Sequence, residues 1–149
     1  MTEGAKPQID EPSEVVGSIY QAALGESTWV CAMEHAASSL KASSAFMFSS
    51  HSDTEPKAVL QAHNHGSEML EEFSRYWHTQ DAWALAARRG GKMARNTVVL
   101  GSELISKREL EKTAFINDFT RHHEMEAMVG SVLFDGTEVD DMPFTILCW

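Results

Sequence analysis

The chain has 149 residues, of which 43% are apolar, and its 22 Asp and Glu outnumber its 12 Lys and Arg to give a net charge of −10. This length fits one compact domain and leaves no room for a second independent module. A surface of this sign repels a polyanion, so we expect this chain itself not to bind nucleic acid. The two cysteines, Cys31 and Cys148, are too few for a disulfide framework, which favours a reducing compartment.

The N-terminal residues show no targeting signal. Residues 1–13 are polar, with Pro7 and Pro12 among acidic side chains, whereas a secretory signal has a basic stretch followed by an apolar one. The apolar runs of the chain also fall far short of the ~20 residues that a membrane-spanning helix needs. We therefore expect a flexible tail over residues 1–13, one domain over residues 14–149, no membrane span and a cytoplasmic location.

The first half of this domain predicts two helices and a β-hairpin. Pro12 and Gly25 bound a helix whose apolar side chains share one face, namely Val15, Val16, Ile19, Tyr20 and Ala23. A second helix starts at Ser27 or Thr28, and its apolar stripe consists of Trp29, Ala32, Met33, Ala36 and Leu40. Strands at 44–50 and 58–64, joined by a polar turn at 51–56, form the hairpin.

The second half predicts three helical segments and three further strands. The helical segments run from Ser67 to Trp77, from an Asp81 cap to Gly90, and from a Ser106 capping box to Phe119. A strand at 97–100 precedes an antiparallel pair at 128–134 and 144–149. Strands and helices do not alternate regularly, so we predict an α+β fold with an antiparallel sheet of about five strands flanked by helices.

Several residue patterns suggest chemistry, and each has a simpler explanation. His63 and His65 lie on one side of a strand, a spacing that can chelate a metal, but an exposed pair at a strand end is the alternative. The run from Arg88 to Lys92 could wrap a phosphate, but a basic helix end with a glycine stop explains it better. Neither cysteine lies in a catalytic motif. We predict no enzyme, no metal and no cofactor.

The stretch from Tyr76 to Trp83 is the most informative one. Aromatic rings with polar tips beside a carboxylate are the components of a small-molecule pocket, because rings supply area and the polar tips supply directed hydrogen bonds. The alternative is ordinary core packing of the same rings.

With this stretch, the sequence resembles the N-terminal sensor domain of LuxR-family transcriptional regulators, in the branch related to autoinducer-binding domains. The resemblance covers residues 15–149. Its carriers are Trp29 with Leu40, the strand at 46–48, Tyr76 with Asp81-Ala82-Trp83, the segment at 115–119 and the segment at 129–133. Ala82 stands where the family usually has proline.

The resemblance implies a PAS-like or GAF-like sensor with a ligand cavity between the sheet and one helical layer. It implies that Tyr76 and Asp81 hydrogen-bond a small-molecule signal, that Trp83 lines the pocket, and that Trp77 and Phe48 belong to the same site. It also implies a homodimer and a DNA-binding helix-turn-helix domain that this chain lacks. We therefore expect the sensor domain to be truncated at Trp149.

The sequence thus predicts a ligand-sensing regulatory domain that controls an attached DNA-binding domain. The alternative is a dimerisation or protein-interaction module with a filled core, in which Tyr76, Trp77 and Trp83 pack and Asp81 caps a helix. A cavity of ~300 Å³ or more beside these residues favours sensing, and its absence favours the alternative.

Overall fold

The computed structural model describes residues 12–49, 58–134 and 144–148. Its helical elements are α1 (Pro12–Ala23), α2 (Trp29–Ser39), α3 (Ser67–Arg75), η1 (Trp77–Thr79), α4 (Ala82–Arg89), α5 (Gly101–Leu104), α6 (Lys107–Leu110) and the π-helix η2 (Phe115–Thr120). Its strands are β1 (Ala45–Ser49), β2 (Ala58–His63), β3 (Val98–Leu100), β4 (Val129–Phe134) and β5 (Phe144–Cys148).

The strands form one five-stranded sheet in the order β2-β1-β5-β4-β3, and every neighbouring pair is antiparallel. The two predicted hairpins, β1 with β2 and β4 with β5, are both present, and β5 joins them by pairing with β1. The prediction of an α+β fold with an antiparallel sheet of about five strands is therefore confirmed.

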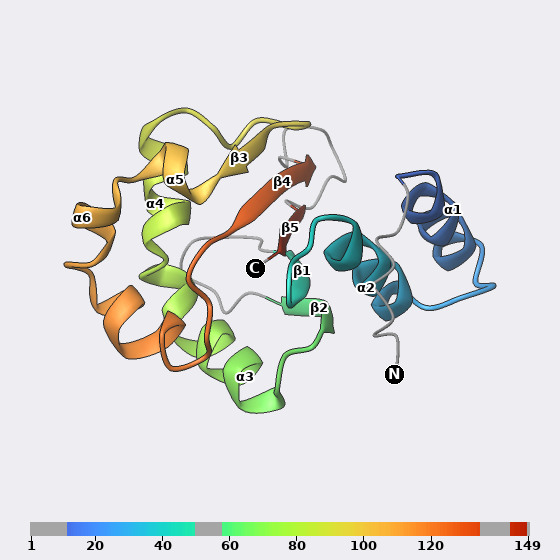
Figure 1. Cartoon of the computed structure of the whole chain (residues 1–149), viewed down its shortest axis with the longest axis horizontal. Helices are drawn as coiled ribbons and strands as arrows, with labels where there is room; N and C mark the ends of the chain where they lie inside the picture. Colours follow the sequence, from blue (N-terminus) through green and yellow to red (C-terminus); the bar gives the residue numbers. More distant parts are fainter. Residues whose placement is uncertain (1–11, 50–57, 135–143, 149) are drawn as a thin grey trace, which may run out of the picture.

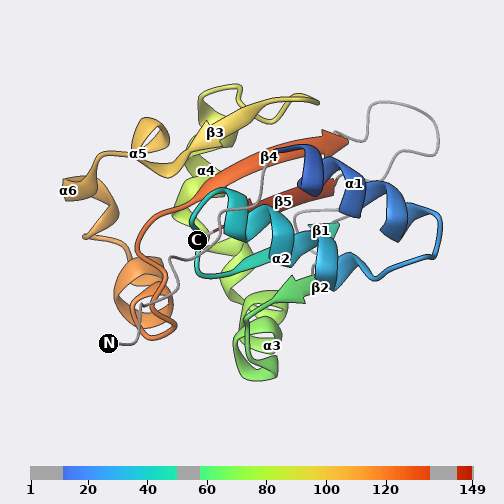
Figure 2. The same ribbon diagram turned by 45° about the vertical axis from the view of Figure 1, so that its right-hand side comes forward.

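Helices cover both faces of the sheet (Figure 1, Figure 2). Side chains alternate along β1, so Phe46 and Phe48 face one side and Ala45 and Met47 the other. The larger core lies on the Phe46 side, where α3, α4 and η2 contribute Phe73, Trp83 and Phe119, and the smaller core lies under α1 and α2. The domain is thus two helical layers of unequal core size around one sheet.

The predicted helix from Ser106 to Phe119 is wrong as one continuous element. The Ser106 hydroxyl accepts from the Glu109 amide at 3.3 Å, as the capping box requires, but α6 ends at Leu110. Thr113 then starts a new helical segment: its hydroxyl donates to the Leu110 carbonyl at 2.7 Å and accepts from the Ile116 amide at 3.3 Å. A threonine that satisfies exposed helix-end groups in this way breaks one helix and caps the next.

Helix α1 forms where predicted, but its large apolar side chains are not the ones that pack. The buried residues of α1 are Ser18 and Ala22, whereas Val16, Ile19 and Tyr20 are exposed. In α2 the predicted stripe does reach the core through Ala32 and Met33, although Leu40 at its end is exposed.

Some predictions fall on residues that the structure does not describe. The tail at 1–11, the turn at 51–56 and the chain end at Trp149 lie outside the described residues, while Pro12 and Ser13 belong to α1 rather than to a tail. Among the helices that the structure describes, none has the length and hydropathy required to cross a membrane.

Candidate functional site

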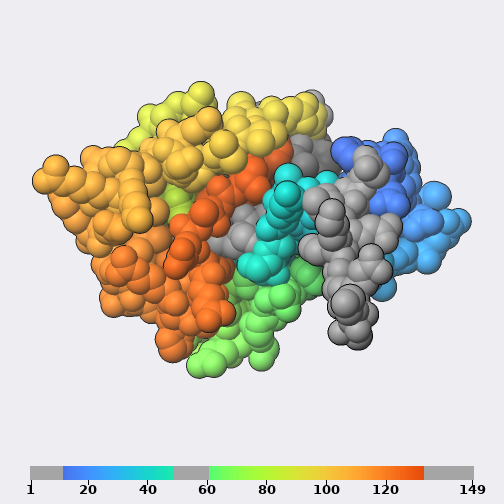
Figure 3. Space-filling model, viewed as in Figure 1, coloured from blue at the N-terminus to red at the C-terminus, as the bar shows by residue number. Residues whose placement is uncertain are grey.

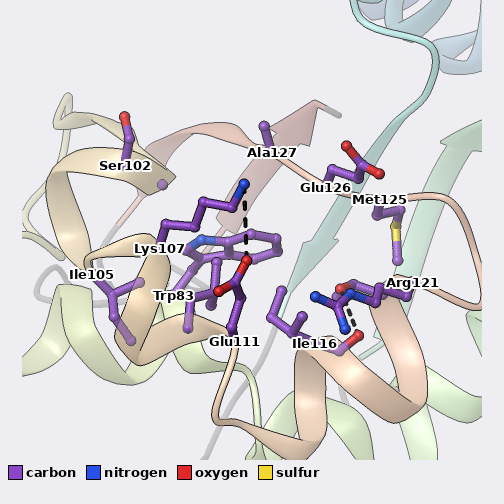
Figure 4. Close-up of a pocket in the computed structure, with 13 residues that line it drawn as sticks. Trp83, Ser102, Ile105, Lys107, Glu111, Ile116, Arg121, Met125, Glu126 and Ala127 are labelled. Atoms are coloured by element: carbon purple, nitrogen blue, oxygen red, sulfur yellow. Dashed lines mark hydrogen bonds and ion pairs between the residues drawn. The ribbon is translucent and has the colours of Figure 1, made fainter.

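A cleft of about 390 Å³ opens beside Trp83, between the α5 and α6 segment on one side and η2 with the approach to β4 on the other. Its floor is apolar and consists of Trp83, Ile116 and Met125, all three of them buried. Figure 4 shows the Trp83 ring lying across the base of the cleft. In the space-filling view, part of α4 is visible in a recess between the chain around α6 and the segment that leads into β4 (Figure 3).

Four charged side chains form the rim of this cleft. They are Lys107, Glu111, Arg121 and Glu126, two cations and two anions, and each belongs to an exposed residue. Lys107 Nζ lies 3.9 Å from Glu111 Oε1, above the Trp83 ring (Figure 4). Arg121 Nη1 donates to Asn117 Oδ1 at 2.8 Å. The cleft therefore combines an apolar base with a polar, solvent-facing mouth.

Local structure fixes the position of Trp83. Asp81 caps α4, and its Oδ1 accepts the backbone amides of Trp83 and Ala84 at 3.0 Å each. Gly101 then allows the indole to lie against the backbone, because a Cβ at this position would stand 2.7 Å from Trp83 Nε1. Phe115 packs edge-on against the ring, with centroids 5.6 Å apart. Trp83 is thus held from three sides and is 1% exposed.

Three of the predicted ligand-binding residues, Phe48, Asp81 and Trp83, do come together in the fold. They line a cavity of about 40 Å³ between α4 and β4, which is room for about one water molecule and not for an organic signal. The helix-capping role that sequence reasoning gave Asp81 in the alternative interpretation is confirmed. The cavity beside Asp81 is therefore too small for the expected ligand, and the larger cleft of about 390 Å³ lies on the other side of the Trp83 ring.

The two remaining predicted residues lie apart from this cavity. Tyr76 follows the end of α3 and is 56% exposed, with its ring 4.9 Å from that of Trp77. Trp77 stacks on Phe119 at 5.4 Å and packs against the larger core. Neither residue lines a described cavity. Their assignment as ligand contacts stays a prediction.

A second, wider cleft of about 680 Å³ lies between α4 and the α5 and α6 segment. It is lined by Leu85, Ala86 and Arg89 of α4 and by Glu109 and Phe115 from the facing chain. Ile105 lines both clefts and so forms part of the wall between them.

The histidines considered as metal ligands lie at the β2 end of the sheet. Burial, and then the charges of His123 and His63, lowers the pKa of His65 to about 4. His123 Nε2 lies 3.2 Å from Glu72 Oε2. Among the described residues, His, Cys, Asp and Glu do not gather in groups of three or more that could hold a metal ion.

Sequence reasoning missed most of the cleft. Ile116 and Met125 form its floor, and Arg121 forms part of its rim, yet none of them was singled out as a site residue. Thr113 was the residue that could have indicated this cleft. A threonine just before an apolar helical stretch is a typical N-cap, so it indicates that one helix ends and another begins at this point.

Comparison with known proteins gives a likeness of fold. No protein-family model and no curated protein sequence matches the chain. The crystal structure of the VqsR LBD domain from Pseudomonas aeruginosa is similar, with a TM-score of 0.64 and 13% sequence identity, over 91% of this chain and 77% of that one. At this identity the likeness shows a shared fold alone, that of the VqsR LBD domain.

Proposed function

We propose that this chain is the ligand-sensing domain of a LuxR-like transcriptional regulator and that it holds a small, largely apolar molecule in the cleft over Trp83. The observation that carries the proposal is the cleft itself: about 390 Å³ with a buried apolar floor and a charged rim. This volume lies within the ~300 to 1,000 Å³ of typical small-molecule sites. It also exceeds the cavity volume of ~300 Å³ above which we favour a ligand-sensing domain over an interaction module with a filled core.

The distribution of polarity defines the class of ligand. The side chains of Trp83, Ile116 and Met125 offer mainly apolar contact area, so the part of the ligand that reaches the floor is largely apolar. Polar side chains gather at the rim, where Arg121 and Glu126 can meet a polar head group that stays in contact with water. We therefore expect an amphiphilic organic molecule with its apolar end inward.

The proposed role is binding and signalling, without a bond made or broken. The fold shared with the LBD domain of VqsR supports it, since that protein is a LuxR-family-like regulator. The net charge of −10 fits a domain that leaves DNA binding to another part of the protein. The proposed location of this protein is the cytoplasm.

A change in the walls of the cleft is how binding would be transmitted. The walls come mostly from the short elements α5, α6 and η2. A ligand that fits only one arrangement of these elements stabilises that arrangement, and a DNA-binding domain attached to the same chain can respond to it.

The test is a thermal-shift screen of amphiphilic metabolites against the wild-type chain and two matched variants. Ala127→Phe adds a bulky side chain at an exposed position that lines the Trp83 cleft, and Ala86→Phe adds the same side chain at a position that lines the second cleft. A compound at 100 times its dissociation constant stabilises the wild type by about 2.7 kcal/mol. We expect Ala127→Phe to abolish this stabilisation and Ala86→Phe to retain it.

Two outcomes would contradict the proposal. If no compound raises the melting temperature of the wild type, the sensing function fails. If stabilisation survives Ala127→Phe and is lost in Tyr76→Phe, the ligand binds where the family resemblance predicts it and not in the Trp83 cleft.

A further inference from the structure

The second cleft, of about 680 Å³, lies along one side of α4. On this helix it is lined by Ala82, Leu85, Ala86 and Arg89. These positions are spaced i, i+3, i+4 and i+7, so they form one stripe on the helix surface. The apolar side chains of such a stripe normally pack into a core, but Leu85 and Ala86 are only partly buried. The stripe therefore borders a space large enough for an organic molecule.

The facing wall of this cleft belongs to the segment that leads from α5 through α6 to η2, which runs past the side of α4 (Figure 1). Leu104, Ile105 and Phe115 give this wall an apolar surface. Thr113 also lines it, but its hydroxyl already donates to the Leu110 carbonyl at 2.7 Å. Because apolar side chains lie on both walls, a ligand between them has to be apolar over most of its length.

Arg89 is the charged end of the stripe on α4. Its guanidinium forms no ion pair and no hydrogen bond with the other residues that the structure describes. At the rim of the Trp83 cleft, by contrast, the Lys107 ammonium lies 3.9 Å from the Glu111 carboxylate. The donors of the Arg89 guanidinium are therefore available to a ligand of the second cleft.

The charges around the second cleft favour an anion on the α4 side. Residues 82–102 contain four Lys or Arg and no Asp or Glu, within a chain whose net charge is −10. Glu109 lines the facing wall, but its Oε2 accepts the Ser106 hydroxyl at 2.9 Å as part of the cap of α6. The α4 side of the cleft is thus its electropositive side.

We propose that the second cleft binds an amphiphilic carboxylate, whose alkyl part lies between α4 and the facing wall and whose carboxylate meets Arg89. A guanidinium can bind a carboxylate through two parallel N–H···O bonds, which fixes the head group at one end of the stripe. Gln80 lines the same cleft, and its side-chain amide can donate a further hydrogen bond to the head group.

This site is distinct from the one proposed over Trp83. Ile105 is the one residue, among those that the structure describes, that lines both clefts. Each cleft can therefore be blocked separately, the second by Ala86→Phe and the Trp83 cleft by Ala127→Phe. The inference does not rest on the proposed sensing function, and the same pair of variants tells the two sites apart.

The first experiment is calorimetric titration of the full chain with sodium decanoate, kept below the concentration at which it forms micelles. Decyltrimethylammonium, which has the same alkyl length and the opposite charge, is the control ligand. We expect decanoate to bind to the wild type and the ammonium compound not to bind. Ala86→Phe is expected to remove the decanoate site, and Ala127→Phe is expected to retain it. Circular dichroism checks that each variant is folded.

The second experiment tests the head group with substitutions of exposed residues, which leave the core untouched. Arg89→Gln is expected to weaken decanoate binding about tenfold or more, because a hydrogen-bonded charge pair is lost. The control Arg108→Gln makes the same change in net charge on α6, at a residue that does not line the cleft, and is expected to bind like the wild type. Glu109→Gln keeps an oxygen for the Ser106 hydroxyl but removes a negative charge, so it is expected to bind decanoate more tightly.

Three results would overturn the proposal. The first is a wild type that does not bind decanoate, or that binds decyltrimethylammonium equally well. The second is an Arg108→Gln chain that loses as much affinity as Arg89→Gln. The third is binding that survives Ala86→Phe and is lost in Ala127→Phe, which would place decanoate in the Trp83 cleft and support the proposed function instead.

Discussion

A methyl group added at Gly101 tests the packing that positions Trp83. The new Cβ would stand 2.7 Å from Trp83 Nε1 and 3.1 Å from Met128 Cγ, so at least one of these side chains must move. Trp83 cannot move freely, because it is 1% exposed, packs edge-on against Phe115 and follows a cap made by Asp81. Overpacking at such a site costs about 1 to 3 kcal/mol, so Gly101→Ala is expected to lower the free energy of unfolding by about 2 kcal/mol.

Gly17→Ala is the matched control for this prediction. Gly17 lies in the interior of α1, and a Cβ there meets nothing within 4 Å. The same substitution is therefore expected to raise the free energy of unfolding by about 0.5 to 1 kcal/mol, through helix propensity alone. Urea denaturation followed by circular dichroism measures both values. A Gly101→Ala chain as stable as the wild type would refute the close packing of Trp83 against this backbone.

Four further substitutions, at three positions, test the two caps and the half-buried His65. Asp81→Ala removes the acceptor for two backbone amides and is expected to lower the free energy of unfolding by about 1 to 2 kcal/mol. Asp81→Asn keeps a side-chain oxygen as acceptor and is expected to retain most of this stability. Equal losses in the two variants would contradict the capping role. Thr113→Ala is expected to cost about 1 kcal/mol by the same measurement, and no loss would contradict its role as a cap. His65 stays neutral in the fold down to about pH 4, but in the unfolded chain it gains a proton near its usual pKa of 6.5. The unfolded state therefore binds more protons between these values, so the stability that is complete above pH 6.5 falls as the pH drops toward 4. His65→Phe is expected to flatten this slope, and a slope equal to that of the wild type would exclude His65 as its source.

Regular periodicities in the sequence predicted most of the fold. The short apolar run at residues 45–48, bounded by polar residues, indicated a buried strand, and the structure places Phe46 and Phe48 on one face and Ala45 and Met47 on the other. For α1 the helical spacing of apolar residues misled, because an apolar row shows only that a helix is amphipathic. Ser18 and Ala22 pack on α2 instead, since small side chains let the two helices approach closely.

The candidate site was predictable only in part, because a motif locates a residue and not the empty space beside it. The position of Asp81 two residues before Trp83 correctly placed both side chains at one end of α4. Residues distant in sequence from Trp83 determine which side of its indole ring is packed by other side chains and which side stays open. Phe48, Val99 and Met128 close the side toward the sheet and leave about 40 Å³, while Ile116 and Met125 leave the other side open.

The broken helix between Ser106 and Phe119 is the physical origin of that open side. A continuous helix would have carried its apolar side chains along one straight stripe, and nothing would have separated α6 from the following segment. Thr113 ends this regularity, and the chain resumes as a π-helix, whose wider turns commonly occur at functional sites. Ile116 and Thr120 then reach the cleft from η2 while Lys107 and Leu110 reach it from α6, so the space over Trp83 lies between two short helical segments on either side of Thr113.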